Sequence, residues 1–232
     1  MEKEYFVLYT PQEMNRAYSL LSENFTDEEI INILINGDDI DRQAALLHLD
    51  RITSQAQAEI LLSLLTGQHG PVREICSARI NDFMHDEAMR KYFCGEKTLK
   101  ILLDALNDII PTVVRNILEV TKFLPEKKVF CKALTDRILA LKDCQEEMEV
   151  LSNHEISKRT FKLYWYLEAL AELTDEIDDK EKLEQIMEFV YQDENYTIRE
   201  KAAKILSRID GFEKYKTVLS QDKNPYVFFN LK

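Results

Sequence analysis

One short pattern recurs along the chain and limits what it can fold into. A polar or Pro-containing turn is followed by an apolar residue beside an arginine in most copies, and then by an amphipathic helix; the clearest copy is residues 196–206. Successive arginines are separated by 31, 42, 44 and 40 residues, at Arg42, Arg73, Arg115, Arg159 and Arg199. Periods of roughly 30 to 47 residues are typical of two-helix solenoid repeats, in which neighbouring pairs share one core. The pattern therefore predicts an all-α repeat fold.

The composition agrees with long helices joined by short loops. Apolar residues make up 45% of the 232 residues, and only 5 glycines and 5 prolines are available for special turns. Thr10, Pro11 and Glu13 form a helix-start signature. We expect helices over residues 10–23, 26–36, 42–53, 55–66, 72–84, 98–107, 112–123, 125–142, 155–173, 179–191, 197–209 and 212–220, with a last one from Pro225. Residues 1–25 are predicted to cap a single continuous array over residues 26–232.

Around the recurring arginine, the sequence resembles the HEAT-repeat family. In that family a turn with Asp and an often Pro-bearing step precede Val-Arg at the start of the second helix of each pair. Asp193 stands six residues before Arg199 in this way, and Asp222 stands six residues before Phe228. The resemblance covers about residues 26–230. It implies a right-handed α-solenoid of about five to six stacked HEAT-like helix pairs.

The resemblance also implies a structural role for the repeated arginines. Arginines at this place reach the turn Asp or the backbone carbonyls of neighbouring units, and the planar guanidinium suits this because it donates several bonds in a fixed plane. By this correspondence we expect a structural ladder, whose members are Arg42, Arg73, Arg115, Arg199 and Asp193. Contact with a ligand is the alternative for these side chains.

The net charge and the spacing of the cysteines limit the classes of partner and the cellular compartment that we expect. A net charge of −12 disfavours nucleic acids and anionic membranes, because phosphate groups repel the chain overall, although a local basic patch stays open. The sequence has no apolar signal core at its start and no run of about 18 apolar residues. The four cysteines are widely spaced, without a CxxC pair or a zinc-like spacing. We therefore expect a cytoplasmic protein with reduced thiols.

No catalytic motif stands out. Gly67 and Gly70 lack the strand and the Lys-Ser/Thr of a phosphate-binding loop. His85 beside Asp86 is a weak metal candidate, and on one helix Cys76 and His85 would lie about 13 Å apart, too far for a nucleophile pair. We predict no catalytic residue, no metal and no cofactor.

By the same resemblance, the second helices of the pairs line a concave face, and their residues outside the main apolar stripe are the predicted contact set. This set comprises Asn116, Glu119, Lys122, Lys158, Lys162, Trp165, Lys201, Lys204 and Arg208. It reads as a local basic track on an acidic protein, and ordinary helix solubilisation is the alternative. Trp165 stands in the run Tyr164-Trp165-Tyr166, which is either core or an aromatic anchor for a partner.

These features favour a non-enzymatic scaffold or adaptor that binds a protein or an acidic peptide on its concave face. The apolar end around residues 225–229 leaves self-association open. The alternative is a HEAT-like enzyme, either a bilin lyase or a DNA alkylation-repair glycosylase. The acidic charge and the single tryptophan disfavour the glycosylase, since that enzyme must hold a duplex.

Overall fold

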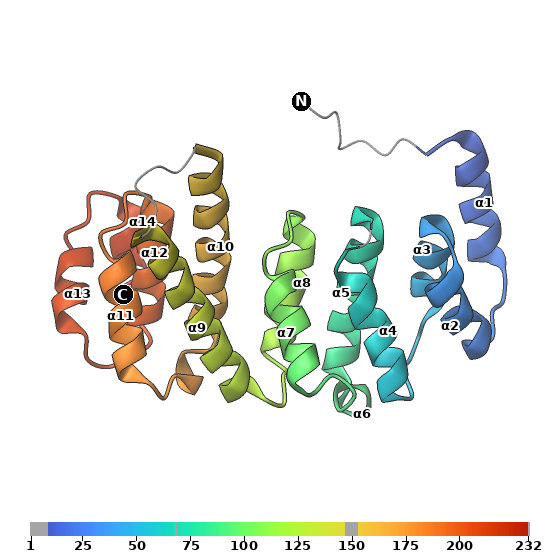
Figure 1. The fold of residues 1–232 in the computed structure, drawn as a ribbon, viewed down its shortest axis with the longest axis horizontal. Helices are drawn as coiled ribbons and strands as arrows, with labels where there is room; N and C mark the ends of the chain where they lie inside the picture. The colour runs from blue at the N-terminus through green and yellow to red at the C-terminus, as the bar shows by residue number, and fades with distance from the viewer. Residues whose placement is uncertain (1–8, 68, 147–152, 232) are drawn as a thin grey trace. The chain divides into compact units, whose positions relative to one another are not determined.

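The computed structural model describes residues 9–67, 69–146 and 153–231, with the side chains of residues 143–157 excepted. Over these ranges the chain forms helices and turns without a β-strand, so the predicted all-α class is confirmed (Figure 1). The chain divides into two compact units, Met1–Phe93 and Cys94–Lys232. The sequence predicted one continuous array over residues 26–232 and gave no sign of a boundary after Phe93.

The first unit contains a two-layered stack of helices. Its helices are α1 (Pro11–Ser22), α2 (Asp27–Asn36), α3 (Asp39–His48), α4 (Gln55–Leu65), α5 (Gly70–His85) and α6 (Glu87–Arg90). Helix α2 packs on α3 and α4 packs on α5, as two pairs. Across the pairs, α2 lies against α4, while α1, α3 and α5 follow one another in the other layer.

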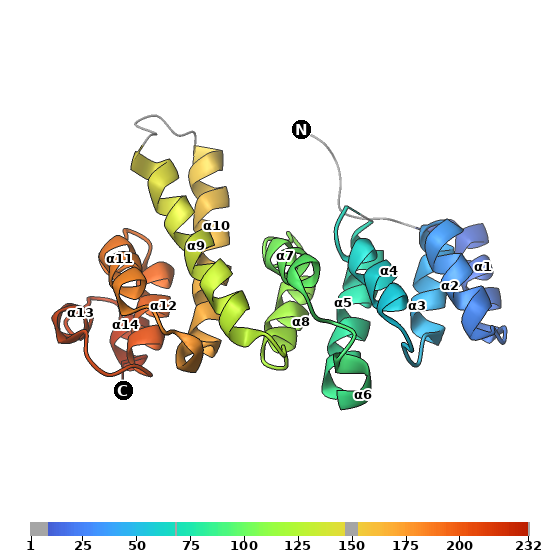
Figure 2. The ribbon, with the colours of Figure 1, turned by 60° about the horizontal axis from the view of Figure 1, so that its bottom comes forward.

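The second unit repeats this layering. Its helices are α7 (Glu96–Ala105), α8 (Pro111–Thr121), α9 (Lys127–Glu146), α10 (Asn153–Glu172), α11 (Lys180–Val190), α12 (Tyr196–Leu206), α13 (Glu213–Leu219) and α14 (Pro225–Phe229), with a 3₁₀ turn at Thr174–Glu176. Helices α7, α9 and α11 form one layer, and α8, α10, α12 and α14 form the other. Figure 2 shows α9 and α10 side by side.

Side-chain caps fix where several helices begin. The Thr10 hydroxyl accepts a bond from the Glu13 amide, and the Glu13 carboxylate accepts one from the Thr10 amide; Thr26 and Glu29 repeat this arrangement. Each such cap contributes about 1 kcal/mol, because it satisfies amides that lack an intrahelical partner. The helix-start signature at Thr10 is confirmed, and the helix predicted over residues 26–36 begins with Thr26 as its cap.

Two differences from the predicted helices have local causes. The helix predicted over residues 42–53 is α3, which begins earlier because the Asp38 carboxylate accepts bonds from the amides of Ile40 and Asp41. It ends earlier because Leu49 and Ile52 are buried in an extended connector. The sequence did not predict α6, which Asp86 caps at 2.7 Å from the amide of Ala88.

The helix predicted over residues 125–142 is α9, which continues to Glu146. Residues 147–152 after it and residues 1–8 at the start of the predicted cap lie outside the described residues.

Burial follows the helical stripes read from the sequence. In α10, Leu163, Leu167 and Leu170 are completely buried, and in α12 Ile198 and Ala202 are as well. Because α10 packs on α12 more extensively than any other pair in the second unit, these stripes form its centre. They fix which residues of the two helices remain at the surface.

Candidate interaction surface

Arg199 joins the loop that precedes α12 to the loop that precedes α14. Its Nε and Nη2 bind the two carboxylate oxygens of Asp222 at 2.6 and 3.1 Å, and its Nη1 donates to the carbonyls of Asp193 at 2.6 Å and Glu194 at 3.1 Å. The pair is mostly buried, with 18% and 10% of the two side chains exposed. Such a bidentate pair fixes geometry as well as adding energy. The hydrogen bond from Arg199 lowers the pKa of Asp222.

The loops that precede α12 and α14 share one hydrogen-bond arrangement. The carboxylates of Asp193 and Asp222 each accept a bond from the amide two residues later, at 2.8 Å in both loops. The side chains of Asn195 and Asn224 each cap the following helix at 3.0 Å. The Asp193 carboxylate therefore shapes its own loop, and the carboxylate that binds Arg199 belongs to the next loop.

The other arginines of the predicted ladder fall into two groups, according to how many residues separate them from the N-cap of their helix. Arg42 and Arg73 stand four residues after their N-caps, as Arg199 does. Arg42 donates from Nε to the carbonyl of Leu34 at 3.1 Å and from Nη2 to that of Ile35 at 3.0 Å, which caps the end of α2. Arg73 is half-buried at the same register of α5.

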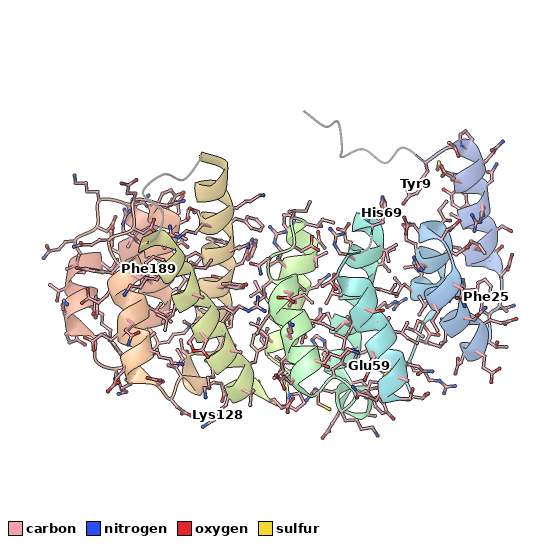
Figure 3. All side chains as sticks on the ribbon, viewed as in Figure 1. Tyr9, Phe25, Glu59, His69, Lys128 and Phe189 are labelled. Atoms are coloured by element: carbon pink, nitrogen blue, oxygen red, sulfur yellow. The ribbon has the colours of Figure 1, made fainter. Side chains whose placement is uncertain are left out.

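Arg115 and Arg159 do not follow that register in the same way. Arg115 stands five residues after the cap Ile110, so Val114 takes the inward position and is fully buried, while Arg115 is exposed. One residue turns a helix by about 100°, enough to move a side chain from the core to solvent. Arg159 donates from Nε to the Leu141 carbonyl at 3.4 Å, and its guanidinium lies 4.9 Å from the ring centre of Phe189, labelled in Figure 3.

The predicted contact residues of α12 and its following turn are paired with carboxylates of α10. Lys201 lies 3.0 Å from Glu168, and Lys204 lies 2.8 Å from both Glu168 and Glu172. Arg208 is 3.6 Å from Glu172 and also donates to the carbonyl of Ala171. We call these five side chains the α10–α12 ion network.

The pKa shifts in the α10–α12 ion network all favour the charged forms. Burial raises the pKa of Glu168 and of Glu172, but their bonds to Lys204 and the nearby cations outweigh burial, so both pKa values are lowered. Burial lowers the pKa of Lys201 and Lys204, but the carboxylates outweigh it, so both are raised. A general acid or base needs a pKa near the working pH, so these groups are suited to holding structure.

Most of the positive charges in the predicted contact set are therefore paired with carboxylates. In α8, Lys122 binds Glu119 at 2.7 Å, and Asn116 is half-buried. Lys158 and Lys162 of α10 differ, since both are exposed and neither forms an ion pair with a described residue. The free positive charge of the predicted contact set is therefore concentrated on α10.

Trp165 lies beside these two lysines in an aromatic cluster. Its ring meets Phe161 edge-on at 6.2 Å and Tyr164 at 5.0 Å between ring centres. Trp165 is half-buried, and its indole N–H has no hydrogen-bond partner among the described residues. Tyr166 instead faces the core, where its hydroxyl accepts a bond from Asn107 at 2.6 Å. The aromatic run is therefore split between the core and the surface.

Sequence reasoning missed Glu168 and Glu172. Their signal was a spacing of four residues on α10, matched by Lys201, Lys204 and Arg208 at three- and four-residue steps on α12. Such spacings place side chains along one helix face. Only the pairing of the two helices shows that the faces meet.

The described residues contain no obvious chemical centre. No group of three or more His, Cys, Asp or Glu side chains among them could hold a metal ion, so His85 and Asp86 lack further ligands. Burial raises the pKa of the Cys76 thiol, and burial with nearby Glu176 and Asp178 raises that of Cys131 to about 12. Both thiols are protonated at neutral pH and therefore poor nucleophiles.

No protein-family model, curated protein or solved structure matches this chain. Among the described helices, none has the length and apolar character needed to cross a bilayer. The contacts and chemistry of the surfaces themselves are therefore the basis for a functional proposal.

Proposed function

We propose that the chain is a non-enzymatic scaffold or adaptor, built as a HEAT-like α-solenoid of about five to six helix pairs. The two-layered packing inside each unit and the shared cap register of Arg42, Arg73 and Arg199 support this architecture. The observation that carries the binding role is the surface of α10, where Trp165 and Phe161 lie beside two exposed lysines that form no ion pair with a described residue.

The chemistry of this surface fits an acidic peptide or an acidic protein segment. Lys158 and Lys162 are four residues apart on α10, as are Phe161 and Trp165, so the two rows run side by side. Trp165 is half-buried, so part of its ring is accessible, and large aromatic side chains of this kind are typical of binding hot spots. Its indole N–H is itself buried, so the ring contributes apolar area and not a hydrogen bond. The α10–α12 ion network supports this face without offering free charge.

Self-association is a second candidate, through the C-terminal end. Tyr226 and Phe229 of α14 are 64% and 59% exposed, and Tyr226 stacks on Tyr196 with ring centres 6.5 Å apart. Exposed aromatic groups gathered in this way are typical of contact surfaces. Sedimentation equilibrium of the intact chain and of Tyr226→Ser tests this: we expect a dimer that the substitution weakens, and a monomer at all concentrations contradicts it.

The α10 surface is tested by affinity capture from native lysate with intact protein and the double variant Trp165→Ala/Lys162→Glu. We expect acidic partners to be lost by the double variant and kept by Lys180→Glu, a control on α11 in the other layer. Lys204 is left unchanged because a glutamate there would face Glu168 and Glu172 and disturb the fold. Circular dichroism checks that all variants stay helical.

The single tryptophan makes the test specific to the site. A recovered acidic partner is titrated into intact protein while the emission of Trp165 is followed, and we expect its maximum to shift as water is excluded from the indole. Unchanged emission with binding, or equal recovery by the double variant, places the partner elsewhere and contradicts the proposal.

A further inference from the structure

The first unit contains an uncharged groove between α1, α3 and α5. Met14, Tyr18 and Leu21 of α1 line one wall, Ile40 and Leu47 of α3 line the other, and Ile75 of α5 closes it. Tyr18 is 65% exposed, and Met14, Leu21 and Leu47 are 43–46% exposed. Large apolar side chains exposed together mark a contact surface more often than a free one.

The shape of the groove suits side chains of a helix. Met14, Tyr18 and Leu21 follow one another at steps of four and three residues, and Ile40 and Leu47 are seven apart, so each wall is one helical row. The cavity volume is about 230 Å³, below the roughly 300–1,000 Å³ of pockets that enclose drug-sized ligands. A groove between two helical rows receives the apolar face of a third helix.

Two of the polar groups that line the groove bind each other. The hydroxyl of Tyr9, which precedes α1 and is labelled in Figure 3, donates to the Gln43 side-chain oxygen at 3.1 Å. No lining residue is charged. The groove itself therefore selects for apolar side chains only.

The negative charge of the first unit indicates which charges a helical partner should carry beside its apolar face. Residues Met1–Phe93 contain 16 Asp and Glu against 8 Lys and Arg, a formal charge of −8, which is two thirds of the −12 of the whole chain. Several of the cations are committed: Arg16 binds Asp38 and Asp41, and the guanidinium groups of Arg42 and Arg79 cap backbone carbonyls. The first unit as a whole is therefore negatively charged, and it attracts a positively charged partner.

We propose that this groove binds a basic amphipathic helix of another protein, with its apolar face in the groove and lysine or arginine on its flanks. A second copy of this chain fits poorly, because its own first unit also carries −8. The proposal does not depend on the α10 surface, which lies in the other unit and selects acidic partners.

Fluorescence anisotropy with synthetic helices tests the proposal on the full chain. The probe is a labelled 18-residue helix of leucine and lysine with all leucines on one face; the comparisons are a scrambled helix of the same composition and an amphipathic helix with glutamate for lysine. We expect micromolar binding of the first and at least tenfold weaker binding of the other two, since both the apolar face and the charge contribute.

A matched pair of variants locates the binding. Leu47→Gln is expected to weaken the leucine–lysine helix at least tenfold, whereas Val218→Gln, at a 40% exposed valine of the second unit, leaves binding unchanged. The same measurements with Trp165→Ala separate this groove from the α10 surface, and we expect no change.

Equal affinity for the amphipathic and scrambled basic helices, or unchanged binding by Leu47→Gln, overturns the proposal. So does a dimer in sedimentation equilibrium that Leu47→Gln dissociates, since it assigns the groove to a second copy. A tenfold gain in affinity on removal of residues 1–8 assigns it to the chain's own N-terminal segment, which also overturns the proposal.

Discussion

The layer formed by α1, α3 and α5 in the first unit and the layer formed by α8, α10, α12 and α14 in the second expose different kinds of side chain. In the first unit, α1 and α3 present apolar side chains that are 43–65% exposed, without a charge among the lining residues of the groove. In the second unit, α10 and α12 cover the corresponding layer with the α10–α12 ion network, whose Lys201 side chain is only 8% exposed. A surface with its charges already paired is stable alone, whereas an uncovered apolar surface is stabilised by a partner.

The arginines of the two units also differ in the groups that they bind. In the first unit Arg42 and Arg79 donate to backbone carbonyls at the ends of α2 and α3, and Arg79 also lies 3.5 Å from the exposed carboxylate of Asp82. In the second unit Arg199 forms a bidentate, mostly buried pair with Asp222. The formal charge of the first unit is −8 and that of the second is −4, a difference that follows from their composition.

The largest expected effect on stability comes from removing the Arg199 side chain, which links two loops of the second unit. Arg199→Ala leaves the mostly buried Asp222 carboxylate without its partner and frees two carbonyls, so we expect a loss of about 3 kcal/mol in the free energy of unfolding. Urea unfolding measures this. Arg115→Ala, one register position away and exposed, is the control and stays within about 0.5 kcal/mol. Equal effects of the two substitutions contradict the register argument.

A smaller loss is expected from the α10–α12 ion network. Lys201→Met keeps the length of the side chain but leaves Glu168 with Lys204 alone. Removing one partner of a buried pair costs about 3–5 kcal/mol, and because Glu168 is 20% exposed and keeps one lysine, we expect about 2 kcal/mol. Lys162→Met, at a lysine that forms no ion pair with a described residue, is the matched control in the same urea experiment. No difference between them shows that the network is energetically neutral.

The pH dependence sharpens the comparison further. The pKa values of Glu168 and Glu172 are below the ordinary 4.5 in the folded chain, so their contribution is present above 4.5 and is lost as pH falls through the lower folded values. Lys201 and Lys204, with pKa values above 10.5, lose theirs only as pH rises beyond that value. We expect the melting temperature of Glu172→Gln to fall less than that of the intact chain below about pH 4.5. Parallel curves contradict this.

The smallest stability effect is expected in the groove of the first unit. Leu47 is 44% exposed, so Leu47→Gln removes little buried area, and we expect a change within about 0.5 kcal/mol. Thermal unfolding measures it, and Arg199→Ala shows that the assay is sensitive. A loss above about 1.5 kcal/mol shows that Leu47 is part of the folded core, and the groove is then no free surface.

Local signals predicted much of the fold. Thr10 and Thr26 marked helix starts because capping involves residues only three apart. The spacing of the arginines did not identify Val114 as the inward residue of α8, since the position of the cap, not the arginine, sets the register. The start of α3 at Asp39 was not predicted, although the Asp38 cap that sets it binds amides only two and three residues away.

Long-range features could not be predicted in the same way. The lysines of α12 looked like free charge because their partners, Glu168 and Glu172, are more than 30 residues away. Met14 and Tyr18 looked like part of a cap, and only the packing of α1 on α3 shows that they line a groove with Leu47. Whether Trp165 is core or surface likewise depends on which helices cover α10.

The paired loops at Asp193 and Asp222 have a consequence for protein engineering. Their wiring uses only residues within two positions of each other, and Arg199 needs only an Asp at the equivalent place in the following loop. The segment from residue 193 to residue 221 is therefore a cassette that carries one such loop, Arg199 and one helix pair. A chain in which this cassette occurs twice in tandem offers each copy of Arg199 its own carboxylate and lengthens the second unit by one helix pair. The second copies of Lys201 and Lys204 then need glutamates on the preceding helix of the same layer in place of Glu168 and Glu172.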